Sequence, residues 1–139
     1  GQLGHFDSLE HDMKRVLQLD PNQTNALNIL GALLTNNKER YPEALNYLNR
    51  AVALDPHDPL VLNNMGWLQF HLGNNQKALD YLNQSYKMQP NNETALHLST
   101  VLWKNGDKTA AKKIVQDALQ KSPNNTQLLE LMNKFKEQP

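Results

Sequence analysis

The sequence predicts an all-α protein, a solenoid of antiparallel helix hairpins, and three observations support this prediction. Four prolines, Pro21, Pro56, Pro90 and Pro123, recur at a nearly fixed spacing of about 34 residues, which is typical of a helical repeat. Apolar residues between these prolines recur every three or four positions, as in amphipathic helices. A small residue also recurs at the same place in successive repeats, where two packed helices must approach closely.

The opening unit, residues 1–23, is predicted to be the second helix of a repeat whose first helix is missing. The loop residues Leu3 to Asp7 match the loop of a later repeat, so we expect the sequence to belong to the C-terminal part of a longer array. One face of this helix is apolar and carries Phe6, Leu9, Met13 and Val16. We therefore expect residues 1–17 to be weakly protected in solution or buried against a second copy of the chain.

The next three units, residues 24–58, 59–92 and 93–125, are each predicted to be a hairpin of two helices closed by a proline. A proline cannot continue the preceding helix, so each one marks a helix end. The first hairpin has a longer turn, residues 36–42, which we interpret as a surface turn or, given its clustered charges, as a contact loop. Gly66 is predicted to be a packing site rather than a hinge.

The last unit, residues 126–139, is predicted to be a capping helix. Leu128, Leu131, Met132 and Phe135 follow the spacing i, i+3, i+4, i+7 and form one apolar stripe. A terminal helix needs one apolar face for the last hairpin and one polar face for water.

These repeats resemble the tetratricopeptide repeat (TPR), whose pattern is W-x2-L-G-x2-Y, then A-x3-F and a closing proline. Two hairpins match at the glycine, alanine and proline positions, with Leu30 and Met65 at the leucine position, while the third has Ser99 in place of glycine. The resemblance implies a TPR superhelix in which the first helix of each hairpin lines a concave groove. Such a groove is expected to bind a peptide or a partner protein.

In each first helix, the residues just after the small residue at the helix–helix contact (Gly31, Gly66 or Ser99) are expected to point into this groove. Trp67, Phe70 and Trp103 are expected to form an aromatic patch there. Aromatic side chains are good anchors because they bury much area at low entropic cost, although a helical aromatic residue is also common in a core. The side-chain amides of Asn28, Asn63 and Asn64 would pair with an extended peptide backbone. The predicted partner-binding residues are Asn28, Asn63, Trp67, Phe70, His71, Thr100, Trp103 and Lys104.

A second resemblance is to the C-terminal repeats of bacterial outer-membrane lipoproteins. It is carried by Met65-Gly66-Trp67, Ala78-Leu79 and Val101-Leu102-Trp103, together with neighbouring positions. The resemblance implies an adaptor on the periplasmic side of the outer membrane that recruits a protease and its substrates. Without it, a cytoplasmic location is expected. The alternative function is a structural or oligomerisation segment of a longer array, with no ligand of its own.

Composition argues against other classes of function. Lys plus Arg and Asp plus Glu both number 14, so no net field favours nucleic acid. The chain has no cysteine, its five histidines include no pair at i, i+4, and no glycine-rich phosphate loop is present. The sequence has no run of about 18 apolar residues, which is the length that a membrane-spanning helix requires. We therefore expect no metal, no cofactor, no catalysis and a protein or peptide partner.

Overall fold

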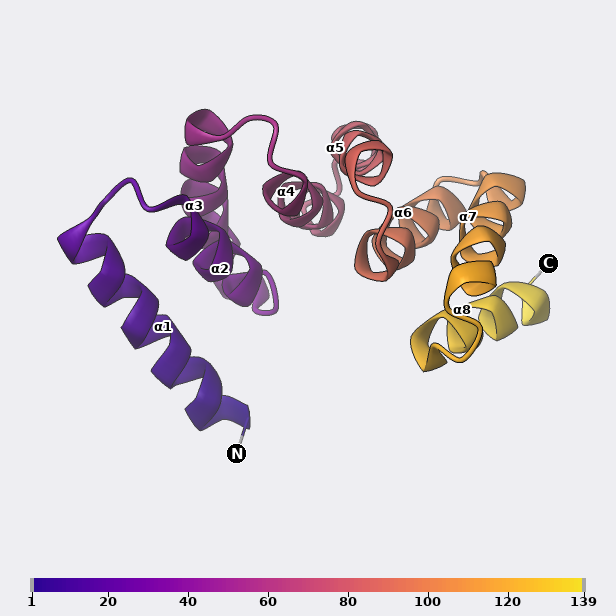
Figure 1. Ribbon diagram of the computed structural model, residues 1–139, viewed down its shortest axis with the longest axis horizontal. Helices are drawn as coiled ribbons and strands as arrows, with labels where there is room; N and C mark the ends of the chain where they lie inside the picture. The colour runs from indigo at the N-terminus through magenta and orange to yellow at the C-terminus, as the bar shows by residue number, and fades with distance from the viewer. Residues whose placement is uncertain (1, 139) are drawn as a thin grey trace.

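A computed structural model describes residues 2–138. Within them the chain forms helices joined by turns and contains no strand, which confirms the predicted fold class (Figure 1). Gly1 and Pro139, the outer ends of the predicted first and last units, lie outside the described residues. The elements are α1 (Gln2–Leu19), α2 (Thr24–Leu34), the 3-10 turn η1 (Lys38–Arg40), α3 (Tyr41–Leu54), α4 (Pro59–His71), α5 (Asn75–Met88), α6 (Asn92–Lys104), α7 (Lys108–Lys121) and α8 (Thr126–Glu137).

The helices pair as antiparallel hairpins that follow one another along an arc (Figure 1). The hairpins are α2 with α3, α4 with α5, and α6 with α7. The first helices α2, α4 and α6 pack side by side on the inner side of the arc, and the second helices lie on its outer side. Helix α1 packs against α2 at one end, and α8 packs against both α6 and α7 at the other. The inner face is therefore built from three first helices.

Local signals set the helix boundaries. Helix α3 ends at Leu54 and α5 ends at Met88, in each case two residues before a proline of the repeating set. The starts of later helices are capped by side chains: Asp58 accepts a hydrogen bond from the backbone N–H of Leu60, and Asn125 accepts one from the N–H of Leu128. Such caps satisfy backbone donors that have no partner within the helix.

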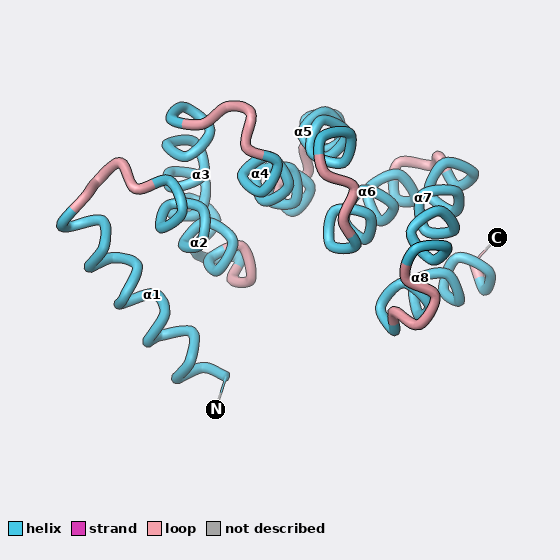
Figure 2. Tube along the Cα trace, viewed as in Figure 1, coloured by secondary structure: helices cyan, strands magenta, loops and turns pink. Residues whose placement is uncertain are grey.

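The turns inside the hairpins, drawn in pink in Figure 2, differ in backbone conformation. In the second and third hairpins a glycine adopts a left-handed conformation, with φ 86° at Gly73 and φ 91° at Gly106, which reverses the chain within a few residues. The first hairpin uses the longer turn that contains η1, where the side chain of Asn37 accepts from the backbone N–H of Glu39. This turn brings Arg40 next to α1.

The close-packing role predicted for Gly66 is confirmed. A Cβ atom at Gly66 would lie 2.7 Å from Cγ of Leu82 on the facing helix α5, and one at Gly31 would overlap Leu48. In the third hairpin Ser99 takes the glycine position and is fully buried, with its hydroxyl donating to the carbonyl of Ala95 over 2.7 Å. In the repeat register, Val115 stands where the first two hairpins have Leu48 and Leu82, so a smaller side chain accompanies the larger serine.

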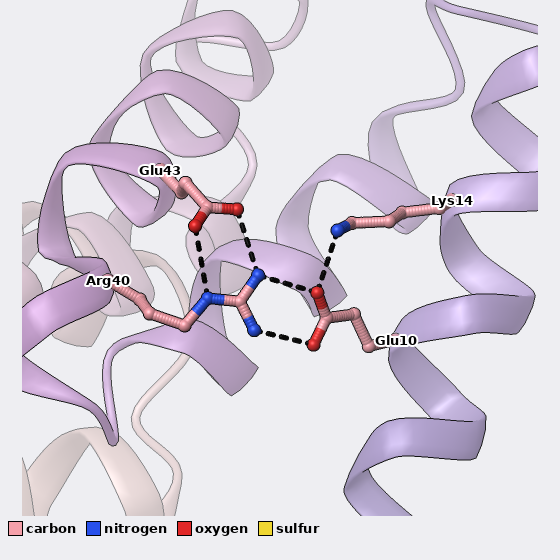
Figure 3. A network of polar contacts seen from close by, with 4 residues as sticks. All are labelled: Glu10, Lys14, Arg40 and Glu43. Carbon is pink, nitrogen blue, oxygen red and sulfur yellow. Dashed lines mark hydrogen bonds and ion pairs between the residues drawn. The ribbon is translucent and has the colours of Figure 1, made fainter.

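Helix α1 is fastened to the first hairpin by an ionic network (Figure 3). The guanidinium of Arg40 donates to both carboxylate oxygens of Glu10, over 2.7 and 2.6 Å, and also to Glu43, over 3.0 and 2.9 Å. Lys14 lies 2.8 Å from Glu10 on the same helix. The apolar side chains of α1 are less well covered: Leu9, Met13 and Val16 are half-buried, and 39% of Phe6 is exposed.

Candidate functional site

The inner faces of α2, α4 and α6 carry three aligned rows of side chains. Residues spaced by four, three and four positions lie on one face of a helix, and this spacing recurs at equivalent places in the three first helices. The rows are Asn25, Ile29, Ala32 and Asn36 on α2 and its turn; Leu60, Asn64, Trp67 and His71 on α4; and Glu93, His97, Thr100 and Lys104 on α6.

Two adjoining pockets lie between these rows, and we refer to them together as the central groove. One has a volume of about 180 Å³ and is lined by Trp67, His97 and neighbouring side chains, and the other has about 380 Å³ and extends past Ile29 to Leu9 of α1. Both pockets share the side chains of Ala32, Asn36, Asn64 and Glu93. Two ionisable residues, His97 and Glu93, are among the described residues that line the central groove. The carboxylate of Glu93 gives this groove a negative charge.

Trp67 lies at the centre of an aromatic cluster. Its ring stacks on His97 of α6, with centroids 4.0 Å apart and 11° between the planes, and on Phe70 one turn further along α4 at 5.3 Å. His71 meets the Trp67 ring edge-on at 4.8 Å. Trp67 and Phe70 also pack on core residues of the second and third hairpins. The half-buried Trp67 therefore belongs partly to the core and partly to the groove wall.

A second feature of the central groove is a chain of polar contacts across α4 and α6. Asn63 is buried, its Nδ2 donates to Oε1 of Glu93 over 3.2 Å, and its Oδ1 lies 2.9 Å from Nδ1 of His97. Because the amide oxygen can only accept, Nδ1 of His97 carries the proton. Burial, and then the charge of nearby His71, lower the pKa of His97 to about 4, so this ring is neutral near pH 7. Asn63 therefore positions both neighbours.

The amides Asn28 and Asn64 form the remaining polar pair of the central groove. Nδ2 of Asn64 donates to Oδ1 of Asn28 over 2.9 Å. Nδ2 of Asn28 and Oδ1 of Asn64 make no hydrogen bond within residues 2–138. The pair therefore leaves one donor and one acceptor next to each other on the groove surface, as a strand of extended backbone requires.

Three of the predicted residues lie elsewhere. Thr100, Trp103 and Lys104 line a separate pocket of about 390 Å³ between α6 and α8, which we call the α6–α8 pocket. The ring of Trp103 stacks on Phe135 of α8, with centroids 4.2 Å apart and 6° between the planes. The three aromatic residues predicted to form one patch therefore fall into two groups: Trp67 stacks on Phe70, and Trp103 stacks on Phe135 of α8.

His97 and Glu93 both line the central groove but are not among the partner-binding residues predicted from the sequence. The signal was available: His97 precedes Thr100 by three positions and Glu93 precedes it by seven, so all three share one face of α6. The packing of α8 against α6 was harder to predict, because the apolar stripe of α8 does not specify which residues of α6 it contacts.

The described residues show neither a metal site nor a membrane helix. Residues 2–138 contain no group of three or more His, Asp or Glu side chains arranged to hold a metal ion. None of the helices among them is long and apolar enough to cross a membrane. The chemistry that the central groove offers is stacking, apolar contact and hydrogen bonding.

Comparison with known proteins places the chain in a family. Residues 30–103, just over half of the chain, match the tetratricopeptide repeat model. A TPR repeat-containing protein of Pseudomonas aeruginosa is 37% identical over 90 residues, which are 65% of this chain. The chain spans only 15% of the length of that relative.

Solved structures agree on the fold. A thermophilic TPR protein of Thermus thermophilus superposes with a TM-score of 0.83 at 19% identity, covering 96% of this chain and 74% of that one. The first TPR of Spaghetti (RPAP3), bound to the HSP90 peptide SRMEEVD, gives a TM-score of 0.72 at 18% identity, covering 85% and 94%. The protein therefore belongs to the tetratricopeptide repeat family, whose fold is that of a protein–protein interaction module.

Proposed function

We propose that the protein is an adaptor that binds an extended segment of a partner protein in the central groove. The observation that carries this proposal is the Asn28–Asn64 pair, which presents an unused amide donor beside an unused amide acceptor. Extended backbone offers a carbonyl and an N–H at a matching spacing, and each such hydrogen bond contributes about 1 kcal/mol. These two amides recognise backbone, so the segment can vary in sequence.

The surroundings of this amide pair favour an apolar side chain on the bound segment. Ile29 of α2 lines the central groove beside this pair and remains 38% exposed. The edge of the Trp67–His97 stack adds a rigid wall, because Asn63 holds the imidazole in place. Rigid aromatic walls bind well because little side-chain entropy is lost on association.

The role as an adaptor extends this proposal. The TPR structure bound to an HSP90 peptide is a related fold that holds a peptide, which supports peptide binding in this chain. The resemblance to outer-membrane lipoproteins supports a periplasmic location and, as partners, a protease and its substrates. In this adaptor we assign residues 1–23 to a single helix, residues 24–58, 59–92 and 93–125 to three hairpins, and residues 126–139 to a closing helix.

Asn64→Leu tests the proposed function, because leucine has the same branching and number of side-chain heavy atoms but lacks the amide oxygen and the Nδ2 donor that bonds Asn28. Peptides are selected from a displayed random library with the wild-type protein, and their affinities are measured by fluorescence anisotropy. We expect Asn64→Leu to weaken binding about fivefold or more, while Asn83→Leu, on the exposed face of α5, leaves it unchanged. Equal affinity for wild type and Asn64→Leu would place the binding site outside the central groove.

A second candidate function is self-association through α1, and one observation favours it. A pocket of about 400 Å³ lies between α1 and the turn after α2, with the exposed ring of Phe6 and the side chain of Leu33 in its wall. A second copy of the chain would cover this apolar surface. Light scattering at increasing protein concentration separates the two candidates, because Phe6→Asp abolishes a dimer formed here and leaves groove binding intact.

A further inference from the structure

The floor of the α6–α8 pocket is built from aromatic and apolar side chains of α6 and α8. Trp103 and Phe135 stack at its base, and Leu131 of α8 adds a third apolar side chain. Phe135 is 3% exposed, so its ring is fixed by the core of the last hairpin and holds Trp103 in turn. The floor is therefore rigid and apolar, and it is present before any ligand arrives.

The rim of this pocket is positively charged. Lys104 of α6 and Lys134 of α8 line it, and no Asp or Glu is among its lining residues. Neither lysine takes part in an ion pair within residues 2–138. Lys108 and Lys112 of α7 lie 5.1 and 5.9 Å from the centre of the Trp103 ring.

The two sites therefore differ in charge along one surface. Glu93 is near the start of α6 and faces the central groove, whereas Lys104 is at the end of the same helix and faces the α6–α8 pocket. Glu93 and Lys104 are eleven positions apart and thus separated by about 16 Å of helix, a length that five residues of extended peptide cover. One bound segment can thus reach both sites.

We propose that the α6–α8 pocket binds an acidic side chain of the partner segment together with an adjacent apolar residue. The apolar residue packs on the Trp103–Phe135 floor, and the carboxylate is held between Lys104 and Lys134. This inference rests on the proposed function, because it places the acidic residue on the segment that occupies the central groove. It also sets the direction in which that segment lies, with its acidic end toward α8.

A charge-reversal experiment tests the α6–α8 pocket. Peptides selected by the wild-type protein are measured against Lys104→Glu/Lys134→Glu and against the control Lys87→Glu/Lys121→Glu. All four lysines lie in the last turn of a helix, so the change in helix-dipole energy is matched between the two variants. Circular dichroism confirms that both variants are folded.

We expect the selected peptides to share an Asp or Glu beside an apolar residue. Their affinity should fall about fivefold or more in the pocket variant and stay unchanged in the control. A peptide with Lys in place of its acidic residue should bind the pocket variant better than it binds wild type. Selected peptides without an acidic preference, bound equally by both variants, would overturn the inference.

The same peptides separate this inference from the proposed function. If Asn64→Leu weakens binding and the lysine variant does not, the central groove is a binding site and the α6–α8 pocket is not part of it. If no peptide is enriched by the wild-type protein, or if Asn64→Leu has no effect, the proposed function fails. Tighter binding of anionic lipid vesicles than of any selected peptide would assign the lysines to a membrane surface and overturn the inference.

Discussion

The two terminal helices of the array, α1 and α8, are attached to their neighbours by different kinds of interaction. Helix α8 buries Leu128, Met132 and Phe135, which are at most 7% exposed. Helix α1 has half-buried apolar side chains and is fastened by Arg40, which binds Glu10 of α1 and Glu43 of α3 (Figure 3). One end of the array thus depends mainly on hydrophobic burial and the other depends strongly on charge.

This difference teaches how each end should respond to solution conditions. The free energy of apolar burial changes little with pH, and high salt does not weaken it. An exposed or half-exposed ion pair is weakened by salt and is lost when its carboxylate is protonated. The α1 end of the array should therefore loosen under acid or high salt while the α8 end remains in place.

The largest effect is expected from Phe135→Ala. This change removes the ring that fills the space between α6 and α8, so it should lower the free energy of unfolding by about 3 kcal/mol. Chemical denaturation followed by circular dichroism measures it, and hydrogen exchange should show that the loss is concentrated in α7 and α8. Leu129→Ala, which truncates a 43% exposed side chain on the same helix, is the matched control. A similar loss in both variants would mean that the stack with Trp103 is not what holds α8.

A smaller effect is expected from Arg40→Ala. Arg40 makes two hydrogen bonds to each of Glu10 and Glu43, but the network is partly open to solvent, so we expect a loss of about 1–2 kcal/mol. Hydrogen exchange should show faster exchange in α1 and unchanged exchange in α8. The control is Lys113→Ala, which removes an exposed pair with Asp117 and should cost only a few tenths of a kcal/mol. Unchanged exchange in α1 would show that apolar contacts alone hold this helix.

The repeats themselves were predictable from the sequence because their signals are local and recur. Proline after each second helix and glycine at the helix seam act within one hairpin, so their spacing identifies the units. The seam even explains the departure at Ser99, which comes with Val115 in place of a facing leucine. None of these inferences needs knowledge of how distant residues meet.

The contacts between successive units were not predictable in this way. Arg40 and Glu10 are 30 positions apart, and so are Asn63 and Glu93. Each pair depends on how one hairpin is rotated against the next, which no local pattern specifies. For the same reason Trp103 was predicted to lie in a patch with Trp67, whereas its ring stacks on Phe135 of α8.

The smallest effect is the response of the α1 attachment to acid. Hydrogen bonds from Arg40 and then from Lys14 lower the pKa of Glu10 from 4.5 to about 2. A carboxyl group whose pKa is lowered by folding adds stability above its unfolded pKa and loses it as the pH falls through its folded pKa. The contribution should thus be complete above pH 4.5 and disappear between about pH 4.5 and 2. Allowing for solvent around the pair, it amounts to about 1 kcal/mol.

Nuclear magnetic resonance can follow this transition at both ends of the array in one sample. The carboxyl carbon of Glu10 should titrate with a midpoint near pH 2, and the amide signals of α1 should change over the same range while those of α8 do not. In Glu10→Gln the acid-dependent change in α1 should be absent, and its stability should equal that of wild type only at the acid limit. A midpoint near 4.5 for Glu10 would show that the ion pair is not formed in solution, and the contrast between α1 and α8 would then have to rest on apolar burial alone.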